Sequence, residues 1–180
     1  NSKHLSPATL ELTAQTTGDI TRVDYYQGTT LIGSATAPPY AATWNNVPTG
    51  KYTLTAQATD NQGLTKTFGK VNVTVNTPPT VTLTSPTATE IYTGLATIAL
   101  TAEASDSDGS ITKVDFYRGG TLIGSATEAP YSVTWADVVP GKHSLTARAT
   151  DDLGAVVRSE TVTITVANPI TVEIATPEKN

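Results

Sequence analysis

Four aspartates in two short segments are the residues whose types and spacing best fit a chemical task. Asp106 and Asp108 lie in a segment of sequence SDSDGS, and Asp151 and Asp152 lie in a segment of sequence TDDLG. Calcium is a hard cation that takes about six to eight oxygen ligands, many of them from carboxylates. If the fold brings the two segments together, the four aspartates form a candidate calcium site.

A second interpretation of the same residues needs no metal. Asp-Gly and Asp-Asp sequences are common in turns, where the aspartate side chain accepts hydrogen bonds from nearby backbone N–H groups. Both interpretations stay open at the level of the sequence.

Catalysis by a nucleophile is not indicated. Such catalysis needs a base held beside a nucleophile, and the histidines of the chain are His4, in an irregular first stretch, and His143. We expect His143 to be an exposed residue of a strand. Without cysteine, a zinc site is equally unexpected. The chain is therefore predicted to be no enzyme, with no catalytic residue and no required cofactor, although a larger protein containing it can be one.

Composition argues against two further classes of partner. The formal net charge is −5, from 16 acidic and 11 basic side chains, and no Lys/Arg cluster is present that would follow a phosphate backbone. Nucleic acid is therefore not expected as a partner. No apolar run approaches the roughly 18 residues of a membrane-spanning helix, so no membrane span is predicted.

One long stretch occurs twice in the chain. Residues 20–44 return as residues 111–135 without insertion, a period of 91 residues. A period of this length is the size of one small domain. We therefore predict a first domain at 1–76, which lacks its first strand, a second domain at 77–168, and a tail at 169–180 that resembles the first strand of a further repeat.

Alternation of apolar and polar residues predicts an all-β fold with about seven strands in each copy. Val114 and Phe116 share one face of a strand, and Asp115 and Tyr117 share the other. Glycines then mark a tight hairpin, and further short strands follow at regular spacing. This pattern is typical of an antiparallel β-sandwich.

A family resemblance rests on motifs in the second copy that run in the order ASDSDG, VDFY, GTLIG, APY, TW, PGK and ARATDDLG, within residues 104–154. With these motifs the chain resembles the bacterial immunoglobulin-like (Big-type) tandem repeat domains of secreted and surface proteins. The resemblance covers the second copy entirely and the first from about Thr9. It implies two tandem immunoglobulin-like antiparallel β-sandwiches.

The same resemblance implies a function and a location. Such repeats are non-catalytic spacers, stalks or adhesion modules beside catalytic or binding modules, in the extracellular space or on the bacterial cell surface. The implied partners are neighbouring immunoglobulin-like repeats of the same chain and a cell-surface protein or polysaccharide.

In a sandwich of this kind the two acidic segments are loops at the same end. The four aspartates would then meet, beside the linker at 76–79, and a calcium ion there would stabilise the junction between the copies. The first copy has the shorter loop TTGD and offers only Asp19, Asp60 and Asn61. The predicted site is thus specific to the second copy.

Aromatic residues support an alternative function. Tyr26 and Tyr117 fall on the strand face opposite the predicted core, where a sugar ring can stack on them. The alternative is an accessory carbohydrate-binding module of a polysaccharide-degrading enzyme. Trp44 and Trp135 alternate with other inward residues and are predicted to pack on the core.

The ends of the two copies differ. The sequence PITVEIATP at 169–177 repeats the sequence PPTVTLTSP at 78–86, and the first copy has no such segment before it. Either the chain is part of a longer array, which is the simpler account, or the tail folds back locally. A vacant edge in the first copy would be open to strand addition by residues 172–175 of a neighbour.

Overall fold

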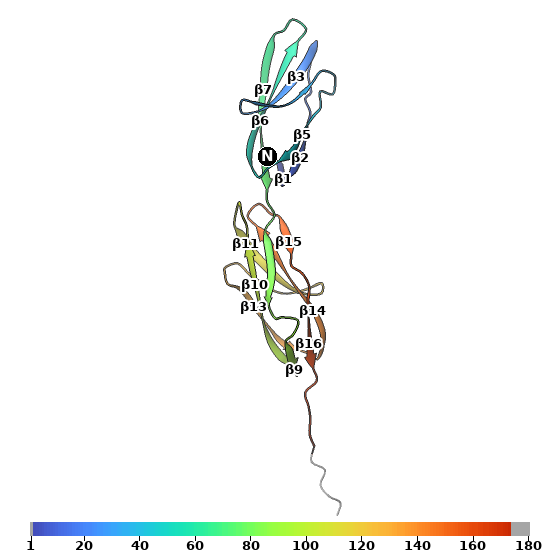
Figure 1. The fold of residues 1–180 in the computed structure, drawn as a ribbon, viewed down its shortest axis with the longest axis vertical. Helices are drawn as coiled ribbons and strands as arrows, with labels where there is room; N and C mark the ends of the chain where they lie inside the picture. The colour runs from blue at the N-terminus through green and yellow to red at the C-terminus, as the bar shows by residue number, and fades with distance from the viewer. Residues whose placement is uncertain (1, 174–180) are drawn as a thin grey trace, which may run out of the picture. The chain divides into compact units, whose positions relative to one another are not determined.

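The computed structural model describes residues 2–173, which form β-strands, turns and loops without any helix. The chain divides into two compact units, Asn1–Pro78 (unit 1) and Pro79–Asn180 (unit 2), against a predicted boundary after residue 76 (Figure 1). None of the described segments is a helix with the length and apolar character needed to cross a membrane. Of the predicted tail, residues 174–180 lie outside the described residues.

Unit 2 is built from two sheets. One has the strand order β13-β10-β8, and the other has the order β12-β11-β14-β16-β9, with β15 paired to β14. Its strands are β8 (Thr80–Ser85), β9 (Ile91–Thr93), β10 (Ala96–Ser105), β11 (Ile111–Arg118), β12 (Thr121–Ala126), β13 (Tyr131–Val138), β14 (Gly141–Asp151), β15 (Val156–Arg158) and β16 (Val162–Ala167). The number of described strands exceeds the expected seven because β9 and β15, of three residues each, are too short to show alternation.

Unit 1 repeats this plan with fewer strands. Its larger sheet has the order β1-β7-β6-β3-β4, and its smaller sheet consists of β2 and β5. The strands are β1 (Ser2–Leu5), β2 (Ala8–Leu12), β3 (Ile20–Gln27), β4 (Thr30–Ala35), β5 (Ala42–Val47), β6 (Gly50–Asp60) and β7 (Thr65–Asn76). Within residues 2–78, no strand occupies the position that β8 has in unit 2.

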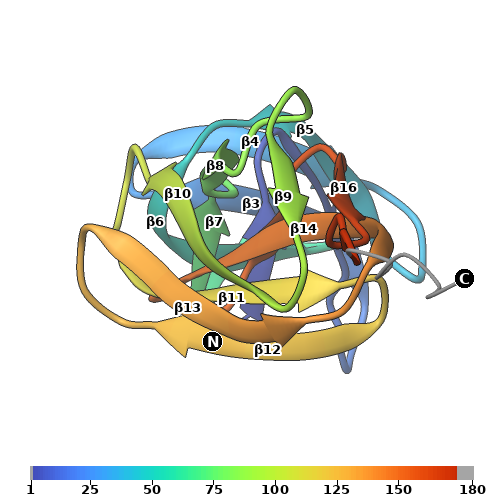
Figure 2. The same ribbon diagram turned by 90° about the horizontal axis from the view of Figure 1, so that it is seen from below.

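Each unit contains one parallel strand pair that alternation did not predict. β1 pairs parallel with β7, and β9 pairs parallel with β16. Figure 2 shows β9 and β16 side by side. The other strand pairs of the described chain are antiparallel. β1 and β9 have only four and three residues, so they carry no period-two signal.

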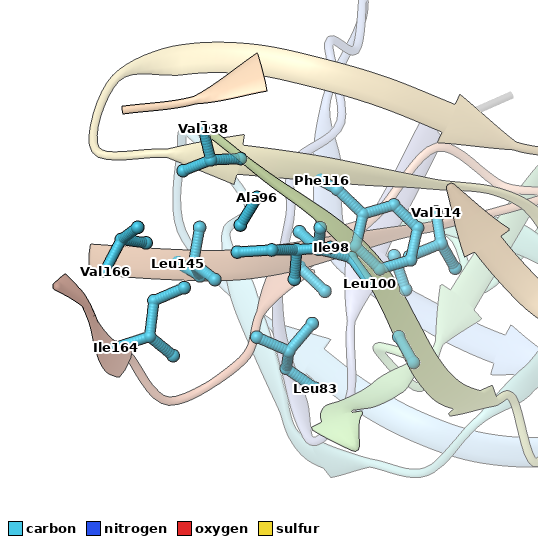
Figure 3. Packing of buried hydrophobic residues seen from close by; sticks show 13 residues of the cluster. Leu83, Ala96, Ile98, Leu100, Val114, Phe116, Val138, Leu145, Ile164 and Val166 are labelled. Carbon is cyan, nitrogen blue, oxygen red and sulfur yellow. The ribbon is translucent and has the colours of Figure 1, made fainter. Parts of the chain in front are cut away.

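The core of unit 2 lies between its two sheets. Phe116 and Leu145 of one sheet and Ile98 and Leu100 of the other are fully buried, as their alternation predicts (Figure 3). Each such side chain contributes about 1.5–3 kcal/mol through its removal from water. In unit 1, Tyr25 takes the place of Phe116 and donates a hydrogen bond from its hydroxyl to a main-chain oxygen of the same core.

Glycines of the duplicated stretch have two separate tasks. Gly28 and Gly119 have φ of 60° and 56° and begin the two-residue turns that join β3 to β4 and β11 to β12. Gly33 and Gly124 lie where the sheets approach closely. A Cβ added at Gly33 would lie 2.8 Å from the Cβ of Ala42, and one at Gly124 would lie 3.2 Å from a methyl carbon of β13. A larger residue at either position would push the sheets apart.

The two tryptophans pack against the cores at half-buried positions, as predicted, but the prediction for His143 is wrong. His143 is 8% exposed, its ring meets that of Trp135 edge-on with centroids 5.1 Å apart, and its Nε2 donates to the oxygen of Val139 at 2.9 Å. Tyr52 makes the equivalent contact with Trp44 in unit 1. His143 has the same strand parity as Leu145, and that signal indicates an inward side chain.

A buried carboxylate network on the outer side of each larger sheet was not foreseen. Asp115 is 7% exposed, accepts a hydrogen bond from Ser125 Oγ at 2.5 Å and pairs with Lys113 Nζ at 2.7 Å. Burial by itself would raise the pKa of Asp115, but the bonds from Lys113 and Ser125 outweigh it and hold the pKa below its ordinary value. Asp24 in unit 1 has the same arrangement with Ser34 and Arg22.

We expect Asp115 to make unit 2 more stable at neutral pH than in acid. Because its folded pKa is lowered, its stabilising effect is complete above the unfolded value of about 3.9 and is lost as the pH falls through the folded value. Thermal unfolding from about pH 7 to pH 2 should therefore show that Asp115→Asn lowers Tm at neutral pH and matters progressively less in acid.

Glu128→Gln is the matched control, since Glu128 is exposed. It should leave the pH dependence of Tm unchanged. A constant Tm difference between Asp115→Asn and the parent at all pH values would contradict the role given to the Asp115 charge.

Candidate functional site

The two acidic loops of unit 2 do meet. Asp106 lies in the loop between β10 and β11, and Asp152 lies in the turn between β14 and β15. A Cβ added at Gly109 would lie 2.2 Å from Asp152 Oδ1 and 2.7 Å from Asp106 Oδ2. The two oxygens are therefore within about 5 Å of each other, which is compatible with ligation of one Ca²⁺ at distances of about 2.3–2.6 Å.

Asp106 carries the unusual group of this site. Its Oδ1 accepts a hydrogen bond from the N–H of Asp108 at 3.2 Å, whereas its Oδ2 is buried and has no hydrogen-bond partner among the described residues. Burial raises the pKa of Asp106, and the charges of Asp108 and Asp151 raise it further, against the lowering effect of the Asp108 N–H. A cation near Oδ2 would offset both the loss of hydration of the carboxylate and its repulsion by the neighbouring carboxylates.

Asp151 and Asp152 make the backbone bonds that the turn interpretation predicts. Asp151 is 2% exposed, and its Oδ1 accepts from the N–H groups of Leu153 at 3.0 Å and Ala155 at 2.7 Å. Asp152 Oδ1 accepts from the N–H of Ser110 at 3.1 Å. Asp108 is exposed. Hydrogen bonds within the turns thus explain the positions of Asp151 and Asp152. They do not explain the burial of Asp106 Oδ2.

The structure brings the four aspartates to one region without arranging them as a finished metal cage. In the described part of the chain, no group of three or more His, Cys, Asp or Glu side chains has the arrangement of a metal site. Any ion held here would take further oxygens from the backbone or water, as calcium commonly does.

The corresponding loops of unit 1 use the same turn without an equivalent of Asp106. Asp60 Oδ1 accepts from the N–H groups of Gln62 at 2.8 Å and Leu64 at 2.9 Å, as Asp151 does in unit 2. The N–H of Asn61 donates to the main-chain oxygen of Asp19 at 3.0 Å. The turn is therefore common to both units. A buried carboxylate oxygen without a hydrogen-bond partner among the described residues, Asp106 Oδ2, belongs to unit 2.

The tyrosines of the carbohydrate alternative lie on the outer face of each larger sheet. Tyr26 and Tyr117 are both half-buried. The guanidinium of Arg148 lies 4.4 Å from the centroid of the Tyr117 ring, and Gln57 holds the equivalent position in unit 1. One face of the Tyr117 ring is thus covered by a cation, which leaves a sugar ring the remaining surface.

Comparison with known proteins identifies the family. Residues 1–56 and 79–166 match the family model of the bacterial Ig domain. Exoglucanase B of Cellulomonas fimi is 33% identical over an alignment of 159 residues, and the match covers 82% of this chain and 14% of Exoglucanase B. Among solved structures, the fibronectin(III)-like modules of Clostridium thermocellum CbhA have a TM-score of 0.57 and 31% identity, covering 98% of this chain and 95% of that one.

The chain thus spans only 14% of the length of Exoglucanase B, while nearly all of it is matched by the CbhA modules. Both the family match and the matched structure extend over strands of unit 1 and of unit 2. Together with the sheets described above, these matches show that the chain belongs to the bacterial Ig domain family.

Proposed function

We propose that this chain is a non-catalytic immunoglobulin-like spacer or adhesive stalk module of a larger bacterial protein that is secreted or displayed on the cell surface. The observation that carries the proposal is the similarity to a small part of Exoglucanase B and to the modules of CbhA, over nearly all of this chain. A segment that recurs inside larger proteins is expected to serve the arrangement of their other parts.

The use of polar side chains supports this proposal. Asp24 and Asp115 are buried in hydrogen-bonded networks, His143 is bonded to a main-chain oxygen, and Ser159 donates to one while accepting from the N–H of Ala147. Such groups stabilise a rigid unit and are not free to act on a substrate. Neighbouring repeats of the same protein are the proposed partners.

An accessory carbohydrate-binding module is the alternative that we propose to test beside the spacer. The similarity to an exoglucanase favours it, and Tyr26 and Tyr117 are its proposed contact residues. Platforms that bind sugars stack them on aromatic rings, and here each ring is half-buried. The proposed partner in this case is a polysaccharide.

Sedimentation of the chain with insoluble polysaccharides separates the two functions. With microcrystalline cellulose, xylan and chitin as probes, we expect the chain to remain in the supernatant, to the same extent as the double variant Tyr26→Ala with Tyr117→Ala. Retention of the parent chain on one polysaccharide, lost in the double variant, would replace the spacer by the binding module.

We also propose that unit 2 binds calcium between its two acidic loops, with Asp106 and Asp152 as direct ligands and Asp108 and Asp151 beside them. Asp106 Oδ2 is buried without a hydrogen-bond partner among the described residues, and its proximity to Asp152 Oδ1 adds to the support for this proposal. Stabilisation of the junction between the two copies by the same ion stays a prediction.

Calcium should raise Tm of the unfolding transition of unit 2, because a ligand that binds only the folded state stabilises it. A gain of about 1 kcal/mol corresponds to about 4–8 °C in a domain of this size. Asp106→Asn should abolish the calcium effect and, in EDTA, should raise Tm above that of the parent, since it removes a negative charge that lies beside Asp108 and Asp151 and whose buried Oδ2 has no hydrogen-bond partner among the described residues.

Asp19→Asn in unit 1 is the matched control and should leave the calcium effect intact. Magnesium at the same concentration should act more weakly, because it requires nearly ideal octahedral geometry. Identical Tm values in calcium and in EDTA for the parent chain would rule the site out.

A further inference from the structure

The basic side chains of unit 2 gather on one of its two sheets. Within residues 79–173, every Lys and Arg lies on a strand of the larger sheet. These residues are Lys113, Arg118, Lys142, Arg148 and Arg158. The carboxylates on the same strands are those of Asp115 and Asp151, which are 7% and 2% exposed. The charged side chains that these strands present to solvent are therefore positive, although the formal net charge of the chain is −5.

Strand pairing places two of these cations side by side on the outer face of the sheet. The neighbours of Arg148 on β14, Ala147 and Ala149, point into the core, so Arg148 points outward. Arg148 lies opposite Arg158 of β15 in the register, and residues directly opposite each other share one face. Like charges in this position destabilise a sheet, and an anion between the two guanidinium groups would offset their repulsion.

Contacts hold the two guanidinium groups in place without neutralising them. Cζ of Arg148 lies 4.4 Å from the centroid of the Tyr117 ring, and Nη2 of Arg158 donates to Thr161 Oγ1 at 3.0 Å. Asp115 lies opposite Arg148 in the register, but its carboxylate is bonded by other side chains of the sheet. Within residues 2–173, neither arginine forms an ion pair with a carboxylate. Both keep N–H donors for a ligand.

An apolar surface lies beside the arginine pair on the same face. Tyr117 pairs with Leu122 of β12, which is 52% exposed. Tyr117 follows Asp115 by two residues on β11, a distance of about 7 Å along the strand. A sugar ring that packs on Tyr117 and Leu122 would thus place an attached carboxylate within reach of Arg148. The planar guanidinium group of arginine matches a carboxylate and binds it through two parallel N–H···O bonds.

We propose that this face of unit 2 binds a polysaccharide that carries uronic-acid carboxylates, with Arg148 and Arg158 as the groups that hold the carboxylate. An apolar surface beside two guanidinium groups is complementary to a sugar ring beside its acid group. Nucleic acid is a poorer fit, because its dense phosphate charge is repelled by the negative charge of the chain as a whole. The proposal goes beyond the spacer function, which does not depend on it.

Unit 1 has the same sheet without the arginine pair. Gln57 and Thr67 hold the positions of Arg148 and Arg158, lie opposite each other in the register of β6 and β7, and are joined by a hydrogen bond from Gln57 Nε2 to Thr67 Oγ1 at 3.4 Å. The proposed site is therefore specific to unit 2. Unit 1 also shows that this sheet forms with neutral side chains at both positions.

Titration calorimetry of the full chain with two polymers of uronic acid, polygalacturonate and alginate, tests the proposal. The titrations are made in EDTA, so that calcium neither gels the polymers nor binds the protein. We expect binding to at least one polymer at about 50 mM salt, and this binding should weaken as the salt concentration rises. Arg148→Gln with Arg158→Thr should weaken it by about tenfold or more, because charge-assisted hydrogen bonds are lost. The double variant should not lower Tm, since unit 1 has these residues.

Arg118→Gln is the matched control for the single variant Arg148→Gln. Both substitutions remove one positive charge from β11 or β14, and unit 1 has glutamine at both positions, Gln27 and Gln57. Arg118 is turned toward the smaller sheet, where its Cζ lies 5.7 Å from the centroid of the Trp135 ring. Arg118→Gln should therefore leave the affinity nearly unchanged, whereas Arg148→Gln should lower it. Equal weakening by the two substitutions overturns the assignment of the binding face.

Two further ligands separate the alternatives. Fully methyl-esterified polygalacturonate has the same sugar backbone without free carboxylates and should bind much more weakly than polygalacturonate. Equal binding of the two polymers overturns the role of the arginine pair. Double-stranded DNA should also bind more weakly, and tighter binding of DNA would replace the polysaccharide by nucleic acid. Absence of binding to both uronic-acid polymers overturns the proposal and leaves the spacer function as it stands.

Discussion

The burial of apolar side chains between two sheets is the constraint on which the rest of the structure depends. Each unit must form its core without a disulfide, and in unit 2 Phe116 and Leu145 from one sheet meet Ile98 and Leu100 from the other. The glycines at 33 and 124 allow the sheets to approach closely at one corner. The hairpin turns, the half-buried tryptophans and the buried aspartates are arranged around this contact, and they would have no fixed geometry without it.

The two units satisfy this constraint to different degrees. In unit 2, β8 places Leu83 in the core and extends the pairing of β10 to Ser105. In unit 1, the smaller sheet consists of two strands, and Phe68 of β7 remains half-exposed. The same family fold therefore exposes an apolar edge in one unit and covers it in the other.

The difference in clustered aspartates between the units lies in the loops, because most strand residues take part in packing and pairing. The turn closed by Asp60 is repeated by the turn closed by Asp151, and both carboxylates accept two backbone N–H bonds. Only the loop of unit 2 adds Asp106, whose second oxygen is buried without a partner among the described residues. Loops vary at little cost to the core, so this is where copies of one domain acquire separate properties.

The sequence by itself determined the all-β class, the duplication and most inward faces, because these follow from a 91-residue period and from alternation within single strands. It also indicated that the two acidic loops would meet, through the resemblance to a known sandwich. Only the tertiary structure decided that Asp115 is paired with Lys113, and that Asp106 Oδ2 has no hydrogen-bond partner among the described residues. It also revealed that β1 pairs parallel with β7 and that β9 pairs parallel with β16. The physical reason is that a pattern within one strand records which side faces the core, whereas the partners of a side chain come from segments distant in sequence.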